Sequence, residues 1–228
     1  MEQVKLTRRS FVAGATAAGA LAALSLTGCG GGSSEKKDDG AKSDDGAKGG
    51  TLTGACAYSS TNVNPIGNSS ALMLAATWHV FEGLYDLDLH TYKTYNALAA
   101  DKPTKISDTE YEVALRDGAK FSDGNEVTAD DVVNAINQNM ADATYGAFLE
   151  FIKSVEAKDA KTVSIKLKYA FEALLETRLS VVKVFPKSLS EDELKTNPIG
   201  SGPWMYKSIN GDDGGAIEFE PNPNYNGP

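Results

Sequence analysis

The sequence predicts an α/β protein with mixed β-sheets, and three stretches carry most of that prediction. Residues 108–139 have the pattern of a strand, a tight turn, a short strand and a helix. Residues 162–167 alternate between apolar and polar side chains, which is the period of a half-buried strand. Residues 71–84 repeat apolar side chains at helical spacing. Helices and strands therefore alternate along the chain, as they do in α/β folds.

The first 28 residues are predicted to be an export signal rather than part of the fold. A twin-arginine pattern at Arg8 and Arg9 precedes an apolar run over residues 11–26, shorter than the roughly 20 residues that span a bilayer. Residues 26–29, Leu-Thr-Gly-Cys, resemble a bacterial lipobox, in which the cysteine is lipidated and becomes the mature N-terminus. We therefore expect Cys29 to anchor the chain to the membrane. The alternatives are a free signal peptide with an accidental Cys29, or an uncleaved anchor.

Residues 29–50 are predicted to form a flexible tether rich in Gly, Ser, Asp and Lys, in which Asp-Asp-Gly-Ala-Lys occurs twice. After Cys29 the tether has no apolar side chain larger than Ala, so burial cannot offset the entropy of ordering it. The folded domain is expected over residues 51–228. The formal charge of −9 argues against a nucleic-acid partner, because nucleic-acid sites need clustered Lys and Arg.

The folded domain is predicted to begin with a strand over residues 51–58, a polar loop over residues 59–70 and the helix over residues 71–84. Cys56 lies within the strand. If Cys29 is lipidated, Cys56 has no partner for a disulfide, so we expect it to be a buried, inert thiol.

The stretch 108–139 is the most strongly patterned part of the chain. Tyr111, Val113 and Leu115 alternate with other side chains, and two Asp-Gly dipeptides follow as tight turns. Thr128 is a good N-cap, and Asp131 three residues later resembles the second member of a capping box. Apolar residues then recur at helical spacing: Val132, Val133, Ile136 and Met140.

The remaining elements are predicted from shorter patterns. A loop over residues 141–147 contains Tyr145, and the strand 162–167 is preceded by another over residues 152–157. The other expected elements are a helix over residues 171–179, an apolar strand over residues 181–185, and strands over residues 204–209 and 217–220.

Four blocks of the sequence resemble the extracellular solute-binding proteins of peptide and nickel ABC importers. They are Leu-Arg-Asp-Gly-Ala-Lys-Phe-Ser-Asp-Gly with the following Val-Thr-Ala-Asp-Asp-Val-Val (115–133), Phe-Glu-Gly-Leu-Tyr-Asp (81–86), Asn-Pro-Ile-Gly-Ser-Gly-Pro-Trp (197–204) and Asn-Pro-Asn-Tyr (222–225). The resemblance implies a periplasmic-binding-protein-like (type II) lobe, with residues 51–228 as the N-terminal part of the solute-binding domain (lobe I). Relatives of this kind clamp ligand between two lobes, so we expect the second lobe to be missing from this sequence.

The resemblance also implies a function. In this function, a lipid-anchored monomer captures oligopeptides outside the membrane and delivers them to ABC permease subunits. Nickel complexes and sugars remain open as ligands. The implied ligand contacts are Asn68 and Ser69 in the loop before a helix, and Tyr145 in the loop after the capped helix. Alternatively, Asn68 and Ser69 cap the following helix and Tyr145 is an exposed aromatic. A groove open on one side cannot bury most of a ligand, so we expect weak or no binding by this chain alone.

A different class of function is a non-transport surface lipoprotein with an interaction or scaffolding role. Enzymatic interpretations have little support. His79 and His90 are the only histidines, and neither has a nucleophile at an interpretable spacing. The sequence has no recognisable zinc spacing and no phosphate-binding glycine loop. We therefore expect no catalytic residues, no metal and no cofactor.

Overall fold

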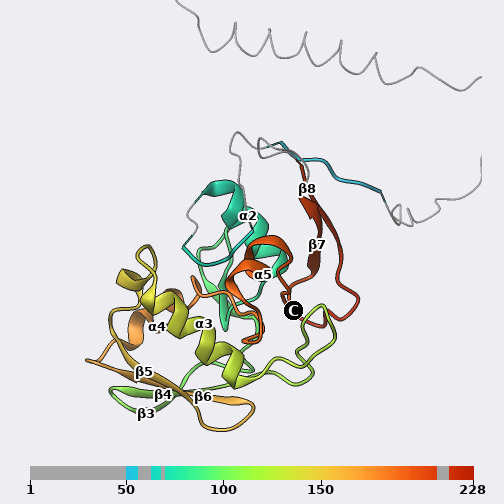
Figure 1. The fold of residues 1–228 in the computed structure, drawn as a ribbon. Coiled ribbons are helices and arrows are strands. Elements are labelled where there is room, and N and C mark those ends of the chain that lie inside the picture. Colours follow the sequence, from blue (N-terminus) through green and yellow to red (C-terminus); the bar gives the residue numbers. More distant parts are fainter. Residues whose placement is uncertain (1–49, 56–62, 68–69, 210–215) are drawn as a thin grey trace, which may run out of the picture. The chain divides into compact units, whose positions relative to one another are not determined.

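The structure is a computed structural model that describes residues 50–55, 63–67, 70–209 and 216–228. The chain divides into two compact units, residues 1–53 and 54–228, and every helix and strand described below belongs to the second (Figure 1). The predicted signal, the tether, Cys29 and Cys56 lie outside the described residues. Within the described ranges, no helix combines the length and apolar character needed to cross a membrane.

The largest sheet has four antiparallel strands in the order β3-β4-β6-β5. Its strands are β3 (Thr104–Ser107), β4 (Glu110–Ala114), β5 (Ile152–Ala157) and β6 (Thr162–Leu167). Tyr111 lies opposite Ile165 and Val113 opposite Val163, and all four side chains are buried. Directly opposed side chains share a face of the sheet, so these pairs form its core-facing side.

Helix α3 (Ala129–Ala141) packs against β5 and β6 and lies over this sheet (Figure 1). Thr128 caps it as predicted: its hydroxyl accepts from the Asp131 amide, and the Asp131 carboxylate accepts from the Thr128 amide at 2.9 Å. Before the helix, Lys120 and Glu126 form an isolated antiparallel bridge. The predicted strand and capped helix within residues 108–139 are therefore confirmed, whereas the predicted short strand between them is reduced to this isolated bridge.

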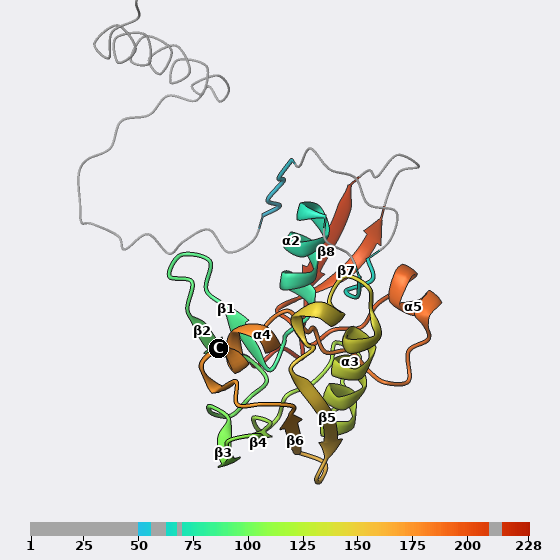
Figure 2. The same cartoon turned by 90° about the vertical axis from the view of Figure 1, so that its left-hand side faces the viewer.

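A second group of elements lies outside the four-stranded sheet. It contains α2 (Ala71–Val80), the hairpin β1 (Tyr85–Leu87) with β2 (Thr94–Asn96), the 3₁₀ turn η2 (Glu172–Leu174) and α4 (Leu175–Leu179). Helix α4 contacts β1. The last elements are η1 (Gly146–Phe148), α5 (Glu191–Thr196) and the hairpin β7 (Trp204–Ile209) with β8 (Ile217–Pro221), which packs against α2 (Figure 2).

Several predicted elements differ in the structure. Residues 51–55 are exposed and form no strand, because no neighbouring strand pairs with them. Helix α2 ends at Val80 rather than at residue 84, since Phe81 is extended. The helix expected over residues 171–179 is a 3₁₀ turn followed by α4. The apolar stretch 181–185 is largely buried but is not a strand, and its Val184 amide donates to the Glu82 carbonyl outside any ladder.

The strand pairings show one more difference. Mixed sheets were expected, yet each pairing in the described part of the chain is antiparallel. The reason lies in the connections. Strands β1–β2, β3–β4, β5–β6 and β7–β8 are consecutive hairpin partners. The crossover through α3 leads to the edge strand β5, and β6 then returns between β5 and β4 as the antiparallel neighbour of both. The α/β content itself is as predicted.

Candidate functional site

The predicted ligand contacts come from two loops that the structure brings together. Asn68 and Ser69 lie outside the described residues, but their neighbour Gly67 is described. A Cβ on Gly67 would lie 2.6 Å from an Asp142 carboxylate oxygen, and Gly67 has a φ of +69°. The positive φ disfavours any side chain at this position, and a Cβ would also require the Asp142 carboxylate to move. We call residues 63–67 and 142–145 the Gly67–Tyr145 edge.

The start of α2 adjoins this edge. The Ser70 hydroxyl accepts from the Met73 amide at 3.2 Å, so Ser70 is the N-cap of α2. The N-cap position, which the alternative interpretation gave to Asn68 or Ser69, is therefore occupied by Ser70. On the other loop, the Asp142 carboxylate accepts from the Thr144 amide at 2.8 Å and from the Tyr145 amide at 2.9 Å. This turn fixes the backbone on which Tyr145 stands.

Tyr145 is 8% exposed, so it is not the exposed aromatic that the alternative interpretation required. Burial, reinforced by the nearby Asp142 carboxylate, raises the pKa of the Tyr145 phenol, which is thus protonated at neutral pH. Its ring lies 6.5 Å from that of Phe148, which is 43% exposed. The Arg178 guanidinium lies 5.4 Å from the centre of the Phe148 ring. The edge therefore continues into a solvent-facing aromatic side chain with a cation beside it.

A buried ion pair lies beyond the end of α2. The carboxylate of Glu82 is 3.1 Å from the guanidinium of Arg116, whose Nε donates to the Ala97 carbonyl at 2.8 Å. Arg116 also donates to the Asn226 side chain at 2.5 Å. Burial raises the pKa of Glu82, although Arg116 opposes that rise. The pair and its hydrogen bonds join four segments of the chain, those of Glu82, Ala97, Arg116 and Asn226, so its role is structural.

A second buried ion pair involves Asp86, which follows Glu82 in the chain and lies in β1. Lys183 donates to the Asp86 carboxylate, and both side chains are almost fully buried. The same carboxylate accepts from the Gly83 amide at 3.3 Å. Sequence reasoning missed both pairs, because their members are 34 and 97 positions apart. The available signal was the placement of Glu82 and Asp86 in an otherwise apolar run.

The glycines of the family-like blocks also have structural reasons. A Cβ on Gly83 would lie 2.8 Å from the Tyr85 carbonyl oxygen, and one on Gly200 would lie 2.0 Å from the Val80 carbonyl oxygen. A Cβ on Gly202 would lie 2.7 Å from the His79 carbonyl oxygen. These three glycines therefore allow backbone segments to approach one another closely around the end of α2.

The two histidines are placed as follows. The His79 ring makes an edge contact with Phe219, with centroids 6.3 Å apart. His90 lies in the turn of the β1–β2 hairpin, where its amide donates to Asp88 at 2.7 Å. Among the described residues, no group of three His, Cys, Asp or Glu side chains is placed to hold a metal ion.

Comparison with known proteins gives a consistent result. The profile of the bacterial extracellular solute-binding proteins, family 5 (middle region), matches residues 93–228. Oligopeptide-binding protein AppA of Bacillus subtilis (strain 168) is 34% identical over 128 residues, or 50% of this chain and 23% of AppA. Glutathione-binding protein GsiB of Escherichia coli O6:K15:H31 is 27% identical over 180 residues, or 71% of this chain and 35% of GsiB.

Solved structures show the same likeness. AppA from Bacillus subtilis in complex with a nonapeptide has a TM-score of 0.63 at 27% identity, covering 73% of this chain and 35% of that one. NikZ from Campylobacter jejuni in complex with Ni(L-His) has a TM-score of 0.60 at 26% identity, covering 74% and 34%. The predicted periplasmic-binding-protein-like (type II) fold is thereby confirmed. The chain spans about a quarter to a third of the length of these relatives.

Proposed function

This chain belongs to the bacterial extracellular solute-binding proteins of family 5, and on that premise we propose that it captures oligopeptides outside the membrane for delivery to an ABC permease. The observation that carries the proposal is the family match over residues 93–228, which includes β4, the capped helix α3 and both hairpins β5–β6 and β7–β8. Members of this family are solute-binding proteins rather than enzymes, so a binding role takes precedence over catalysis.

Peptide is the proposed ligand class because of the relatives. AppA is an oligopeptide-binding protein that has been solved with a nonapeptide, and GsiB is a glutathione-binding protein. NikZ, with its Ni(L-His), keeps a nickel complex as a competing candidate. Small polar groups and aromatic rings can hydrogen-bond and pack on a peptide backbone without selecting a charge.

We place the ligand at the Gly67–Tyr145 edge, with Asn68, Ser69 and Tyr145 as contacts. The close approach of Gly67 to Asp142 supports this placement, because it puts the segment that continues into Asn68 and Ser69 beside the turn that carries Tyr145. Tyr145 contributes little exposed surface, so Phe148 beside it is the larger aromatic surface available to a ligand.

The proposed protein acts as a monomer held at the outer face of the cell membrane. Residues 1–28 would direct export by the twin-arginine route, Cys29 would carry the lipid, and residues 29–50 would be the tether. The lipid-anchored, extracytoplasmic location agrees with a family whose members are extracellular.

Photo-crosslinking tests the ligand class and its place together, and it detects weak binding. A benzophenone amino acid replaces Phe148, which is 43% exposed beside Tyr145, or Tyr92, which is 77% exposed on the β1–β2 hairpin and is the control. A fluorescent nonapeptide should label the Phe148 position on irradiation and leave the Tyr92 position unlabelled. Excess unlabelled peptide should suppress the labelling, whereas Ni(L-His) should not.

Other outcomes contradict the proposal in distinguishable ways. Suppression by Ni(L-His) alone would replace the peptide with a nickel complex as the ligand. Equal labelling at both positions would remove the Gly67–Tyr145 edge as the site. Labelling at neither position by the fluorescent nonapeptide would contradict peptide binding at this edge and would favour the surface lipoprotein with an interaction role.

A further inference from the structure

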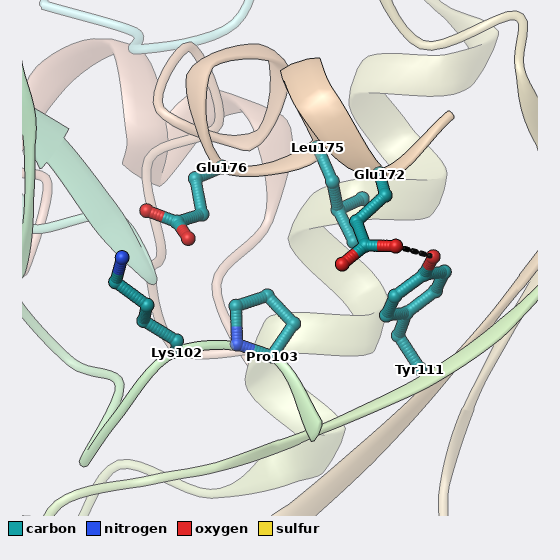
Figure 3. A pocket seen from close by; sticks show the side chains of 6 residues that line it. All are labelled: Lys102, Pro103, Tyr111, Glu172, Leu175 and Glu176. Atoms are coloured by element: carbon teal, nitrogen blue, oxygen red, sulfur yellow. Dashed lines mark hydrogen bonds between the residues drawn. The ribbon is translucent and has the colours of Figure 1, made fainter. Parts of the chain in front are cut away.

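A pocket with a volume of ≈ 180 Å³ lies where the segment before β3 faces α4 (Figure 3). It is lined by Lys102, Pro103, Tyr111, Glu172, Leu175 and Glu176. None of these residues belongs to the Gly67–Tyr145 edge. A water molecule occupies about 30 Å³ of liquid, so the pocket has room for about six waters or one small organic molecule. Sites for drug-sized ligands begin at about 300 Å³, which excludes an oligopeptide here.

One wall of the pocket is already neutralised. The Glu172 carboxylate accepts from Lys105 Nζ at 2.9 Å. It also accepts from the Tyr111 hydroxyl at 3.3 Å (Figure 3). The hydrogen bond from Lys105 holds the pKa of Glu172 below its usual value. Glu172 is therefore a charged but satisfied group, and it orients the Tyr111 hydroxyl at the pocket wall.

The opposite side carries two charges that are not paired with each other. Figure 3 shows the Lys102 ammonium and the Glu176 carboxylate pointing toward one another from two different segments. Glu176 accepts from the Thr94 hydroxyl at 2.8 Å. Within the part of the chain that the structure describes, no ion pair engages either Lys102 or Glu176. A direct, solvent-exposed ion pair between Lys102 and Glu176 would add little stability. A ligand that binds between them therefore gives up little free energy by keeping them apart.

Beside these two charges the pocket is lined by apolar groups. Leu175 and Tyr111 are each 1% exposed, and the half-buried Pro103 ring lies at the centre of the view in Figure 3. The arrangement thus offers one cation, one anion that faces it, and a small apolar surface beside them. A ligand that satisfies all three carries an anion and a cation close together on a short apolar body.

We propose that this pocket binds a free α-amino acid with a small apolar side chain. Its carboxylate pairs with Lys102, its ammonium pairs with Glu176, and its side chain packs on Pro103 and Leu175. Charge-assisted hydrogen bonds of this kind are roughly twice as strong as neutral ones, so both ends contribute to recognition. In a dipeptide the termini are separated by about 3.3–3.6 Å more, which this volume does not accommodate.

Isothermal titration with three related compounds tests the proposal on the full chain. L-valine carries both charges, L-valinamide lacks the carboxylate, and N-acetyl-L-valine lacks the ammonium. The wild-type chain should bind L-valine at least about tenfold more tightly than either blocked compound, because each lost charge removes one ion-assisted hydrogen bond.

Two variants assign the ends of the ligand. Lys102→Met should weaken L-valine to the level of L-valinamide and leave L-valinamide unchanged. Glu176→Gln should weaken L-valine to the level of N-acetyl-L-valine and leave that compound unchanged. Lys153→Met and Glu150→Gln, at exposed positions outside the pocket, are the matched controls and should bind L-valine like the wild type.

The wild-type comparison needs no variant to fold, so the proposal stays testable if one fails. Equal binding of all three compounds, or no heat with L-valine up to its solubility limit, would overturn it. Wild-type affinity for L-valine in folded Lys102→Met and Glu176→Gln would overturn it as well. The peptide proposal for the Gly67–Tyr145 edge is unaffected by these outcomes, since it concerns other residues and another ligand class.

Discussion

The Glu82 carboxylate lies 3.1 Å from the Arg116 guanidinium, and their side chains are only 6% and 16% exposed. Arg116 thereby joins the segment after α2 to the Ala97 carbonyl and to Asn226 near the end of the sequence. Glu82 and Arg116 lie within two of the sequence blocks that resemble the family, 81–86 and 115–133. Part of the role of those blocks is therefore structural, because they supply the two members of a buried ion pair.

Replacing Arg116 with Met should destabilise the fold by about 3–5 kcal/mol, because it leaves the Glu82 carboxylate buried without a counter-charge. Urea unfolding followed by circular dichroism measures this loss. The double variant Arg116→Met/Glu82→Gln should recover part of it. Lys158→Met, which breaks the exposed pair with Glu112, is the control and should cost under about 1 kcal/mol. A similarly small cost for Arg116→Met would contradict the structural role.

Removing the Tyr206 hydroxyl should stabilise the protein. In the described part of the chain this buried hydroxyl has no hydrogen-bond partner, and an unsatisfied buried polar group costs about 1–3 kcal/mol. We expect Tyr206→Phe to raise the free energy of unfolding by about 1 kcal/mol. Tyr169→Phe changes a tyrosine that is 49% exposed and should have no effect. A loss of stability in Tyr206→Phe would show that the hydroxyl has a partner.

The same variant should show a pH dependence. Burial raises the pKa of Tyr206 above the usual 10.0, so the folded state resists losing the phenolic proton. Below pH 10 the phenol is neutral in both states and its contribution to stability is complete. As the pH rises toward the folded pKa, the unfolded state ionises first and stability falls. The advantage of Tyr206→Phe over the wild type should therefore grow above pH 10.

Gly200 should tolerate no side chain. A Cβ there would lie 2.0 Å from the Val80 carbonyl oxygen, so Gly200→Ala must displace backbone and should cost about 3 kcal/mol or more. Thermal unfolding reports this loss. Gly54→Ala is the matched control, because no heavy atom lies within 4 Å of its Cβ position. Equal melting temperatures for the two variants would mean that the contact between Gly200 and α2 is loose.

The proposed anchor predicts a difference between the two cysteines. Cys29→Ser should move the protein from the detergent phase to the aqueous phase in Triton X-114 partition and should remove the lipid mass from the mature chain. Cys56→Ser is the control and should leave both unchanged. Detergent partition of Cys29→Ser at the wild-type level would refute lipidation at that residue.

Local patterns explain which elements were predictable. Strands β5, β6 and β7 have the predicted bounds, and the Thr128–Asp131 cap is present, because alternation and capping depend on neighbouring residues. Helix α5 was missed although Ser190 and Glu193 form a capping box, since its six residues carry little apolar periodicity.

Elements and contacts that depend on distant partners were not predictable. Residues 181–185 have a strand-like composition, but they form no strand with a ladder partner, and most of their side chains are buried in the core. The Asp86–Lys183 pair joins residues 97 positions apart, which no local pattern encodes. For the candidate site, the sequence predicted that Tyr145 lies in the loop after the capped helix, as it does, but did not indicate its burial or the neighbouring Phe148.

The central claim is that this chain serves oligopeptide capture for an importer, and uptake of a labelled nonapeptide by cells tests it most directly. Disrupting the gene should abolish peptide uptake. The wild-type gene should restore it, the Cys29→Ser gene should restore much less, and nickel uptake should be unaffected throughout. Unchanged peptide uptake in the disrupted strain, with or without a change in nickel uptake, would contradict the account.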